Sequence, residues 1–233
     1  MNSNDGKKFV ELLKKREKLE GTRIFRTLHH LATSQYAVNK NYHAFSKAIK
    51  FYENNLSIWE VTKRPQLNAF LREFLRLLHN YLASVYSLIE HTRIFCKELN
   101  NAELNSEYAV KLKELQNHIC VRFVRDLRTY SQHIQLPIIS AKLSFTKTEH
   151  SDGGETRQQI LLSSDELLKW KQWHKDSKKY LGSLKEIDLK VVLNKYQILI
   201  EAFYKWLYEK VEELYREHLE ELAKIESELA KFS

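Results

Sequence analysis

The chain has 233 residues, 43% of them apolar and 12% aromatic, a composition that supports a buried core and excludes a wholly disordered protein. Its 38 Lys and Arg residues exceed its 30 Asp and Glu residues by eight, which is compatible with a polyanionic partner without requiring one. The two cysteines, Cys96 and Cys120, are too few for a disulfide framework and do not stand at a zinc-binding spacing, so we predict buried free thiols, no metal and no cofactor.

The start of the chain, Met-Asn-Ser-Asn-Asp-Gly-Lys-Lys, lacks the charged and then apolar pattern of a signal peptide, and no run of about 18 apolar residues occurs. We therefore expect a cytoplasmic protein with no membrane partner. The sequence has neither a Gly-rich phosphate loop nor paired carboxylates at a metal-binding spacing. This disfavours nucleotide hydrolysis and metal catalysis.

The N-terminal part of the chain predicts two helices. Residues 7–20 form a short charged pattern with apolar positions at helical spacing, and Gly21 is its predicted stop. Apolar residues then recur at helical spacing over about 24–52, which predicts a second and longer helix. The pair Asn54-Asn55 is expected to end it.

Basic charge is concentrated in this same region. Residues 1–50 carry eleven Lys and Arg against four Asp and Glu, whereas residues 187–233 carry seven against ten. The stretch from Lys7 to Lys50 therefore forms either part of an RNA-facing wall or an ordinary solvated face, and the sequence leaves both readings open.

The clearest helix of the chain follows in the middle. After a connection over 56–64, Pro65 opens a wide apolar stripe with the spacing of a buried bundle helix, which runs to a turn at Asn100. A further stripe predicts the next helix over about 103–133. Pro137 biases the residue before it away from the α region, so we expect this helix to end shortly before it.

Beyond Pro137 the periodicity changes from helical to alternating. Apolar and polar residues alternate over 139–146 and again over 158–162, on either side of a turn signal at Ser151–Gly154. This pattern predicts a β-hairpin at about 138–163, inserted between helices. An isolated hairpin is only marginally stable, so we expect it to lie on the bundle or to pair with a second chain.

A capping box, Ser163-x-x-Glu166, predicts the start of another helix, which carries Trp170 and Trp173 and ends at Gly182. The two tryptophans could stack on nucleic-acid bases. Aromatic residues at helical spacing are more often packing residues, and we favour packing of the hairpin against the bundle.

From Asp188 to the end the helical pattern hardly breaks. A single helix of about 44 residues would be on the order of 65 Å long, more than one domain of this size covers, so its last half should protrude, bend or pair with a partner. The sequence thus predicts a mainly α protein in which residues 1–233 form one domain. We expect a helical bundle with the hairpin inserted at 138–163 and a long C-terminal helix.

The stretch with functional potential lies at the end of the 103–133 helix, where four residues separate Arg128 from His133. Arg is a permanent cation whose planar fork suits phosphate oxygens, and His, with a free pKa of about 6.5, can take and give a proton near neutral pH. Together they suit metal-free RNA cleavage, with Arg128 stabilising charge on the phosphoryl group and His133 as the general acid or base.

The surrounding pattern, Leu127-Arg128-x-Tyr130-x-Gln132-His133-x-x-Leu136-Pro137, resembles the HEPN superfamily, whose signature is Arg, four to six residues, then His. It looks closest to bacterial members that read Leu-Arg-Asn-Tyr-x-x-His-x-x-Leu-Pro. The resemblance implies a helical bundle that forms a homodimer, so that two Arg and His pairs face one cleft. It also implies a metal-independent endoribonuclease of a toxin–antitoxin or phage-defence system, with Arg128 and His133 as the catalytic pair.

One position departs from this pattern: Thr129 stands where active members carry Asn, Asp or His. It keeps a hydroxyl but loses the group that would orient its neighbours. Many members of the superfamily are non-catalytic, so the alternative is a helical module that binds RNA or a cognate protein partner. We assign supporting roles to Thr129, Tyr130 and Arg125, the last as a phosphate contact, and assign no other RNA-binding residue.

Helical geometry adds a constraint on the pair. Five residues at about 100° each place Arg128 and His133 about 140° apart around a regular helix, so they do not share a face. Either the helix unwinds near Ser131, or a second copy of the chain completes the site. We prefer the second copy, because a two-fold interface can bring the Arg of one chain close to the His of the other.

Overall fold

A computed structural model of the protein describes residues 3–147 and 154–232. The helices are α1 (Ser3–Lys18), α2 (Glu20–Glu53), α3 (Arg64–Leu99), α4 (Ala102–Asn117), α5 (Ile119–His133), α6 (Ser164–Leu167), α7 (Lys175–Gly182), α8 (Leu189–Leu214) and α9 (Arg216–Leu229). The strands are β1 (Ile139–Lys147), β2 (Gly154–Ser163) and β3 (Glu186–Asp188), and short 3-10 helices cover Leu56–Trp59, Val61–Lys63 and Ala230–Phe232. The chain is therefore mainly α, as the sequence predicted.

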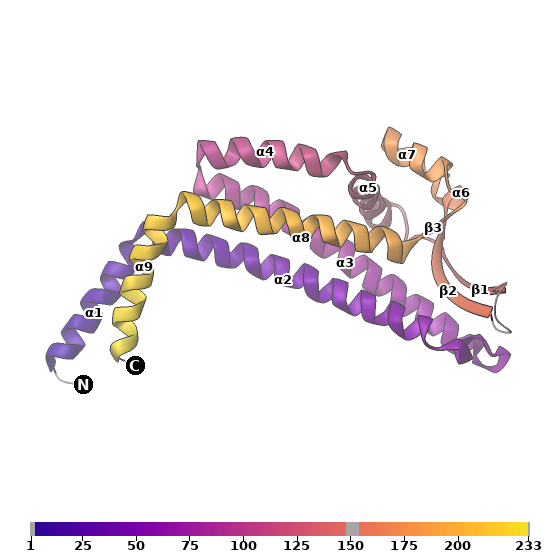
Figure 1. Ribbon diagram of the computed structural model, residues 1–233, viewed down its shortest axis with the longest axis horizontal. Coiled ribbons are helices and arrows are strands. Elements are labelled where there is room, and N and C mark those ends of the chain that lie inside the picture. Colours follow the sequence, from indigo (N-terminus) through magenta and orange to yellow (C-terminus); the bar gives the residue numbers. More distant parts are fainter. Residues whose placement is uncertain (1–2, 148–153, 233) are drawn as a thin grey trace.

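The long helices α2, α3 and α8 run side by side through the molecule, with α4 along the same direction (Figure 1). The same view shows α5 nearly end-on, so this helix crosses the others instead of extending α4. At one end of the bundle, α1 and α9 lie against each other near the two termini, and the three strands lie at the other end.

The expected stop at Gly21 is wrong. The chain breaks two residues earlier, at Leu19, whose ψ of 137° is extended, and α2 begins at Glu20. Gly21 is instead a contact point between helices, because a Cβ atom there would collide with the backbone carbonyl of His218 in α9. Glycine allows two helix backbones to approach at this crossing, and that is its function in the sequence.

The predicted bounds of α2 and α3 are otherwise confirmed. Asn54 caps the end of α2, and Pro65 stands in the first turn of α3, where its missing N–H leaves no helical bond unmade. The two helices pack through fully buried rings, with Phe45 and Phe74 at a centroid distance of 4.8 Å. Asn100 ends α3 in the left-handed conformation, with φ at 47°.

The predicted helix over 103–133 is two helices. His118, with φ −72° and ψ 127°, separates α4 from α5 and allows α5 to turn across the bundle. The break lets the apolar side of α5 reach the core, where Phe123 and Leu127 are fully buried. Ile119, which belongs to the predicted apolar stripe, is 39% exposed. The Arg122 guanidinium donates to the Gln116 carbonyl oxygen at 2.6 Å, which satisfies an acceptor that the break leaves free.

The β-hairpin is confirmed, and it carries a third strand. β1 pairs antiparallel with β2 from Ile139 opposite Leu162 onward, and β3 pairs with the other edge of β2. With three residues, β3 is too short to give an alternating pattern in the sequence. Of the predicted turn at Ser151–Gly154, residues 151–153 lie outside the described part of the chain.

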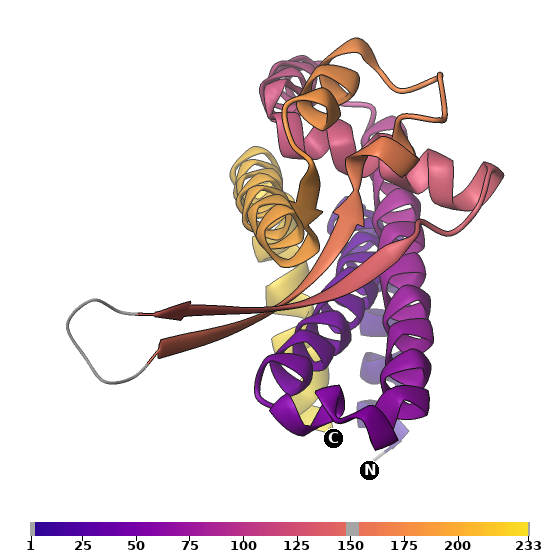
Figure 2. The same ribbon diagram turned by 90° about the vertical axis from the view of Figure 1, so that its right-hand side faces the viewer.

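The hairpin rests on the bundle only at its base. Ile160 and Leu162 of β2 are buried in the main core, whereas Leu143 and Phe145 of β1 are exposed. Figure 2 shows the strands reaching away from the helices toward the hairpin end. The base of the hairpin therefore packs on the bundle as expected.

The predicted helix from Ser163 to Gly182 is interrupted. Only the N-cap half of its capping box is confirmed: the Ser163 hydroxyl accepts the Glu166 backbone N–H at 3.4 Å, whereas the Glu166 carboxylate pairs with Lys169. The helix α6 lasts a single turn, and α7 carries the remainder to Gly182. Between them, the buried Trp173 indole donates its N–H to the Leu167 carbonyl at 2.7 Å. The same carbonyl also accepts the Trp170 backbone N–H at 3.1 Å, so both bonds satisfy an acceptor at the end of α6.

The C-terminal helix bends, which is one of the three outcomes expected for it. Tyr215, with φ −117° and ψ 19°, separates α8 from α9, and α9 then packs on α1 and α2. The beginning of α8 is fixed by Asp188, whose carboxylate accepts the backbone N–H groups of Lys190 and Val191 at 3.0 and 3.3 Å. Such a carboxylate at a helix N-terminus satisfies free donors and complements the helix dipole.

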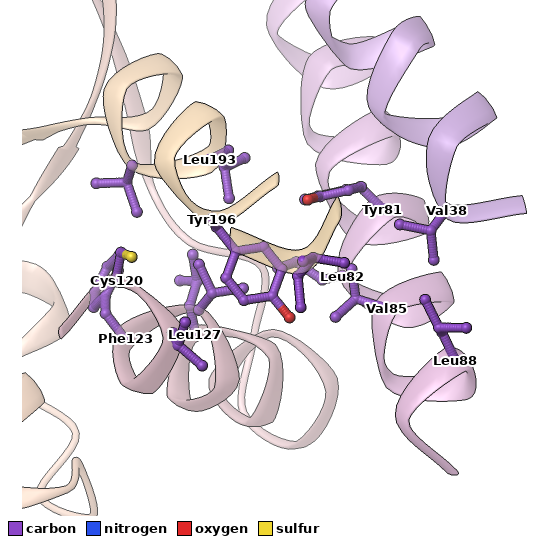
Figure 3. Close-up of a cluster of buried hydrophobic side chains, with 14 of the residues drawn as sticks. Val38, Tyr81, Leu82, Val85, Leu88, Cys120, Phe123, Leu127, Leu193 and Tyr196 are labelled. Carbon is purple, nitrogen blue, oxygen red and sulfur yellow. The ribbon is translucent and has the colours of Figure 1, made fainter. Parts of the chain in front are cut away.

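The core lies where α3, α5 and α8 meet (Figure 3). In this view the Tyr196 ring reaches from α8 between Leu127 of α5 and Leu82 of α3. Both cysteines are buried free thiols, as predicted, and burial raises the pKa of Cys96 to about 11. Within residues 3–147 and 154–232, none of the helices combines the length and apolar content that crossing a bilayer requires.

Candidate functional site

The motif arginine is held by an aromatic ring from another helix. Arg128 lies on α5, and its guanidinium carbon stands over the Tyr86 ring of α3, 3.5 Å from the ring centroid. The Nε of Arg128 is buried and has no hydrogen-bond partner among the described residues. A guanidinium in this position is ordered by the ring but keeps hydrogen-bond donors free.

Three further arginines lie around the same cavity as Arg128, and each has a carboxylate within ion-pair distance. Arg93 has Glu90 at 2.6 Å, Arg122 has Asp176, and Arg125 has Asp126 at 3.5 Å. In the part of the chain that the structure describes, no carboxylate stands within ion-pair distance of Arg128. Of the four arginines, Arg128 is therefore the one most able to bind an anion from outside the chain.

The cavity beside Arg128 has a volume of about 130 Å³ and lies between α3, α4, α5 and α8. Its walls are mostly aliphatic and aromatic, with the four arginines as their charged part. Arg93 and Arg125 are 60% and 52% exposed, so the cavity opens to solvent on their side. Arg125, which the sequence placed as a supporting phosphate contact, thus does lie beside Arg128.

His133 does not join Arg128 in this chain. It is the last residue of α5, it is exposed, and it does not line the cavity. The helix stays regular between the two residues, because Ser131 lies within α5 and its hydroxyl donates to the Leu127 carbonyl at 2.7 Å. The alternative in which the helix unwinds near Ser131 is therefore wrong, and a regular α5 separates the two residues by about 140° around the helix axis.

The two supporting residues between them are occupied by contacts within the chain. The Thr129 hydroxyl donates to the Arg125 carbonyl at 3.2 Å, one turn back along α5. Tyr130 is buried, its ring stacks on Trp173 at 5.8 Å, and its hydroxyl accepts the Gln135 side-chain amide at 2.8 Å. Tyr130 therefore anchors the end of α5 to the segment between α6 and α7, which holds the motif in place.

The tryptophans take part in this anchoring. The Trp170 and Trp173 rings contact each other at 5.0 Å in an edge-to-face arrangement, and both contact Tyr130. Trp173 also stacks on Phe123 at 5.8 Å. Both tryptophans are therefore packing residues, as favoured from the sequence, but they pack against α5 and not between the hairpin and the bundle.

The basic N-terminal region is partly neutralised. Arg23 pairs with Glu20, Arg16 pairs with Glu226 of α9 at 2.5 Å, and Arg26 pairs with Glu17 at 2.7 Å. Arg16 connects α1 to α9 and Arg26 connects α2 to α1, whereas Arg23 pairs within α2 and also donates to the Glu98 carbonyl of α3 at 2.7 Å. They are thus committed to contacts within the bundle and contribute less to an RNA-facing wall than their number in the sequence indicates.

Residues that the sequence did not indicate complete the site. Tyr86 belongs to the apolar stripe predicted for α3 and was assigned to the core, but it is 39% exposed and carries the Arg128 guanidinium. Tyr108 of α4 and Tyr196 of α8 line the cavity. Burial raises the pKa of Tyr108 to about 12 and also raises the pKa of Tyr196, so both hydroxyls are protonated at neutral pH.

Comparisons of the chain with protein-family models, with curated proteins and with solved structures found no match. The resemblance to HEPN proteins therefore rests on the sequence motif. Within the described residues, no three His, Cys, Asp or Glu side chains gather closely enough to hold a metal ion.

Proposed function

We propose that the protein is a metal-independent endoribonuclease of HEPN type, in which each of the two sites of a dimer is shared between two copies of the chain. Arg128 of one copy binds the phosphate, and His133 of the other copy transfers the proton. The observation that carries this proposal is the state of Arg128. It is ordered over Tyr86, its Nε is buried without a partner, and no carboxylate in the described residues neutralises it.

The reaction follows from these two groups. His133 takes the proton of the ribose 2′-hydroxyl, whose oxygen then forms a bond to the neighbouring phosphorus. The bond from phosphorus to the 5′-oxygen breaks, and that oxygen takes a proton from water, which leaves a 2′,3′-cyclic phosphate and a 5′-hydroxyl. Arg128 donates hydrogen bonds to the phosphoryl oxygens and stabilises the charge that develops on them.

A second copy is proposed because one chain keeps the two groups apart. Exposed apolar residues follow His133 directly in the sequence, at Ile134, Leu136 and Ile138, and Leu143 and Phe145 of β1 are exposed as well. A second copy that covered these side chains would remove their apolar area from water. β1 is also an edge strand of the sheet, with unpaired backbone groups along one side.

The test is cleavage of a mixed RNA substrate by the purified protein in EDTA, followed by analysis of the product ends. We expect cleavage with cyclic-phosphate ends, and we expect His133→Ala to reduce the rate by roughly 100-fold or more, as loss of a general acid or base does. His30→Ala, an exposed histidine on α2 that lies away from the cavity, is the matched control and should retain the wild-type rate. Equal cleavage by wild-type protein and His133→Ala would overturn the proposal.

A second candidate is a non-catalytic module that binds RNA or a cognate protein partner. The observation that favours it is Thr129, whose hydroxyl is engaged by its own helix and does not orient either Arg128 or His133. For RNA, this candidate predicts binding without cleavage. RNA affinity would fall in Arg128→Ala and stay unchanged in His133→Ala.

A further inference from the structure

The cavity beside Arg128 is too large to be a packing defect. Its volume of about 130 Å³ is well above the roughly 10–15 Å³ that a cavity needs to hold one water molecule, and at about 30 Å³ per water it has room for about four. Most of its wall is apolar, with Ile89, Leu112 and Phe203 among the lining residues. Water in such a space makes few hydrogen bonds, so an apolar group can displace it favourably.

Aromatic rings and hydroxyl groups from three helices line the same space. Tyr108 contacts Phe203 edge-to-face at 5.9 Å, and the Tyr108 and Tyr196 rings both border the cavity. Neither of these two hydroxyls has a hydrogen bond to another described residue. Flat walls of this kind fit a planar ring, which can stack or make edge contacts, better than a flexible alkyl chain.

The charged residues that line the cavity are all positive. They are the four arginines, and no Asp or Glu is found among the lining residues in the described part of the chain. Arg128 lines this space with its Nε buried and without a hydrogen-bond partner, and Arg125 stands one turn before it on the same helix. A carboxylate or phosphate at this position would replace the missing partner of Arg128.

We propose that the cavity binds a small amphipathic anion, a molecule with a planar aromatic body and one carboxylate or phosphate group. The aromatic body occupies the apolar space between α3, α4 and α8, and the anionic group meets Arg128 and Arg125. Binding requires neither His133 nor a second copy of the chain. It is therefore independent of RNA cleavage, although an anion on Arg128 would exclude an RNA phosphate from the same guanidinium.

Titration calorimetry with four probes measures how much the aromatic ring and the negative charge each contribute to binding. 1-Naphthoate and 1-naphthyl phosphate carry both the ring and the charge, 1-naphthalenemethanol carries the ring alone, and inorganic phosphate carries the charge alone. We expect the two anionic naphthalenes to bind at one site per chain and the other two probes to bind roughly ten-fold more weakly or worse. If inorganic phosphate bound as tightly as 1-naphthyl phosphate, the aromatic ring would contribute nothing to binding, and the proposal would be overturned.

Substitutions locate the binding. Arg128→Met keeps the length of the side chain but removes its charge, and Leu112→Trp fills the cavity. Both should weaken binding of 1-naphthyl phosphate by roughly ten-fold or more. Arg72→Met, at an exposed arginine on α3 outside the cavity, is the matched control and should bind like the wild type.

Circular dichroism and the melting temperature establish that each variant is folded, and loss of binding in either folded cavity variant supports the site. Unchanged binding in a folded Leu112→Trp variant would contradict it. We expect His133→Ala to lose RNA cleavage but to bind 1-naphthyl phosphate normally. The cleavage assay therefore tests the proposed ribonuclease, and the binding assay tests the ligand site separately.

Discussion

At the scale of single residues, the site depends on the contact between a cation and a ring. Arg128 could be recognised from its sequence context, because the motif around it is local. Its partner Tyr86 stands 42 positions earlier and fits the apolar stripe of α3 as well as any core residue. Nothing in the sequence separates a tyrosine at the edge of such a stripe from one at its centre, since the difference is made by α5 packing beside it.

This contact gives a prediction for stability. Tyr86→Ala removes the ring under Arg128, and we expect the free energy of unfolding to fall by about 0.5–2 kcal/mol, through the lost cation–π contact and the lost packing. Tyr86→Phe keeps the ring face and should lose much less. Urea denaturation of the three proteins measures both values, and an equal loss in the two variants would show that the hydroxyl, not the ring, is what matters.

At the scale of elements, the sequence predicted which segments are helical better than where they turn. Breaks at His118 and Tyr215 occur without Pro or Gly, because burial of the following helix against the bundle outweighs continuation of the preceding one. The interruption before α7 is compensated by a side-chain bond from Trp173 to Leu167, which only the folded chain reveals. Gly21 is the opposite case: this glycine does not end a helix but allows two helices to cross closely.

The crossing of α2 and α9 is testable at that glycine. We expect Gly21→Ala to lower the free energy of unfolding by about 1–3 kcal/mol, because the added methyl group collides with the His218 backbone and the helices must separate. Gly182→Ala is the matched control. A Cβ there meets no neighbouring atom, and alanine favours a helix, so stability should be unchanged or slightly higher. Thermal unfolding compares the two, and a stable Gly21→Ala protein would argue against the close approach.

At the scale of the whole molecule, the fold class was available from the sequence and the cavity was not. Helical stripes and one alternating segment were enough to predict a bundle with a hairpin. The cavity is built by four helices that are distant in the sequence, and α5 contributes to it only because the chain turns at His118. A pattern search along one helix cannot show such an arrangement.

Whether Arg128 and His133 act together depends on how whole chains assemble. One chain places Arg128 at the cavity and His133 on the exposed end of α5, and the regular helix between them keeps the two apart. The exposed apolar residues that follow His133 would be covered if a second copy packed against them. A shared site would then need one residue from each chain.

Mixing two inactive variants tests this claim most directly. Arg128→Ala and His133→Ala are each expected to be inactive on RNA in EDTA. When their subunits exchange freely, about half of the dimers are mixed, and each mixed dimer holds one intact site of two, so about a quarter of the wild-type rate should return. Recovery of cleavage on mixing would establish a site shared between copies. No recovery, with subunit exchange verified by labelled chains and the wild-type protein active, would contradict it.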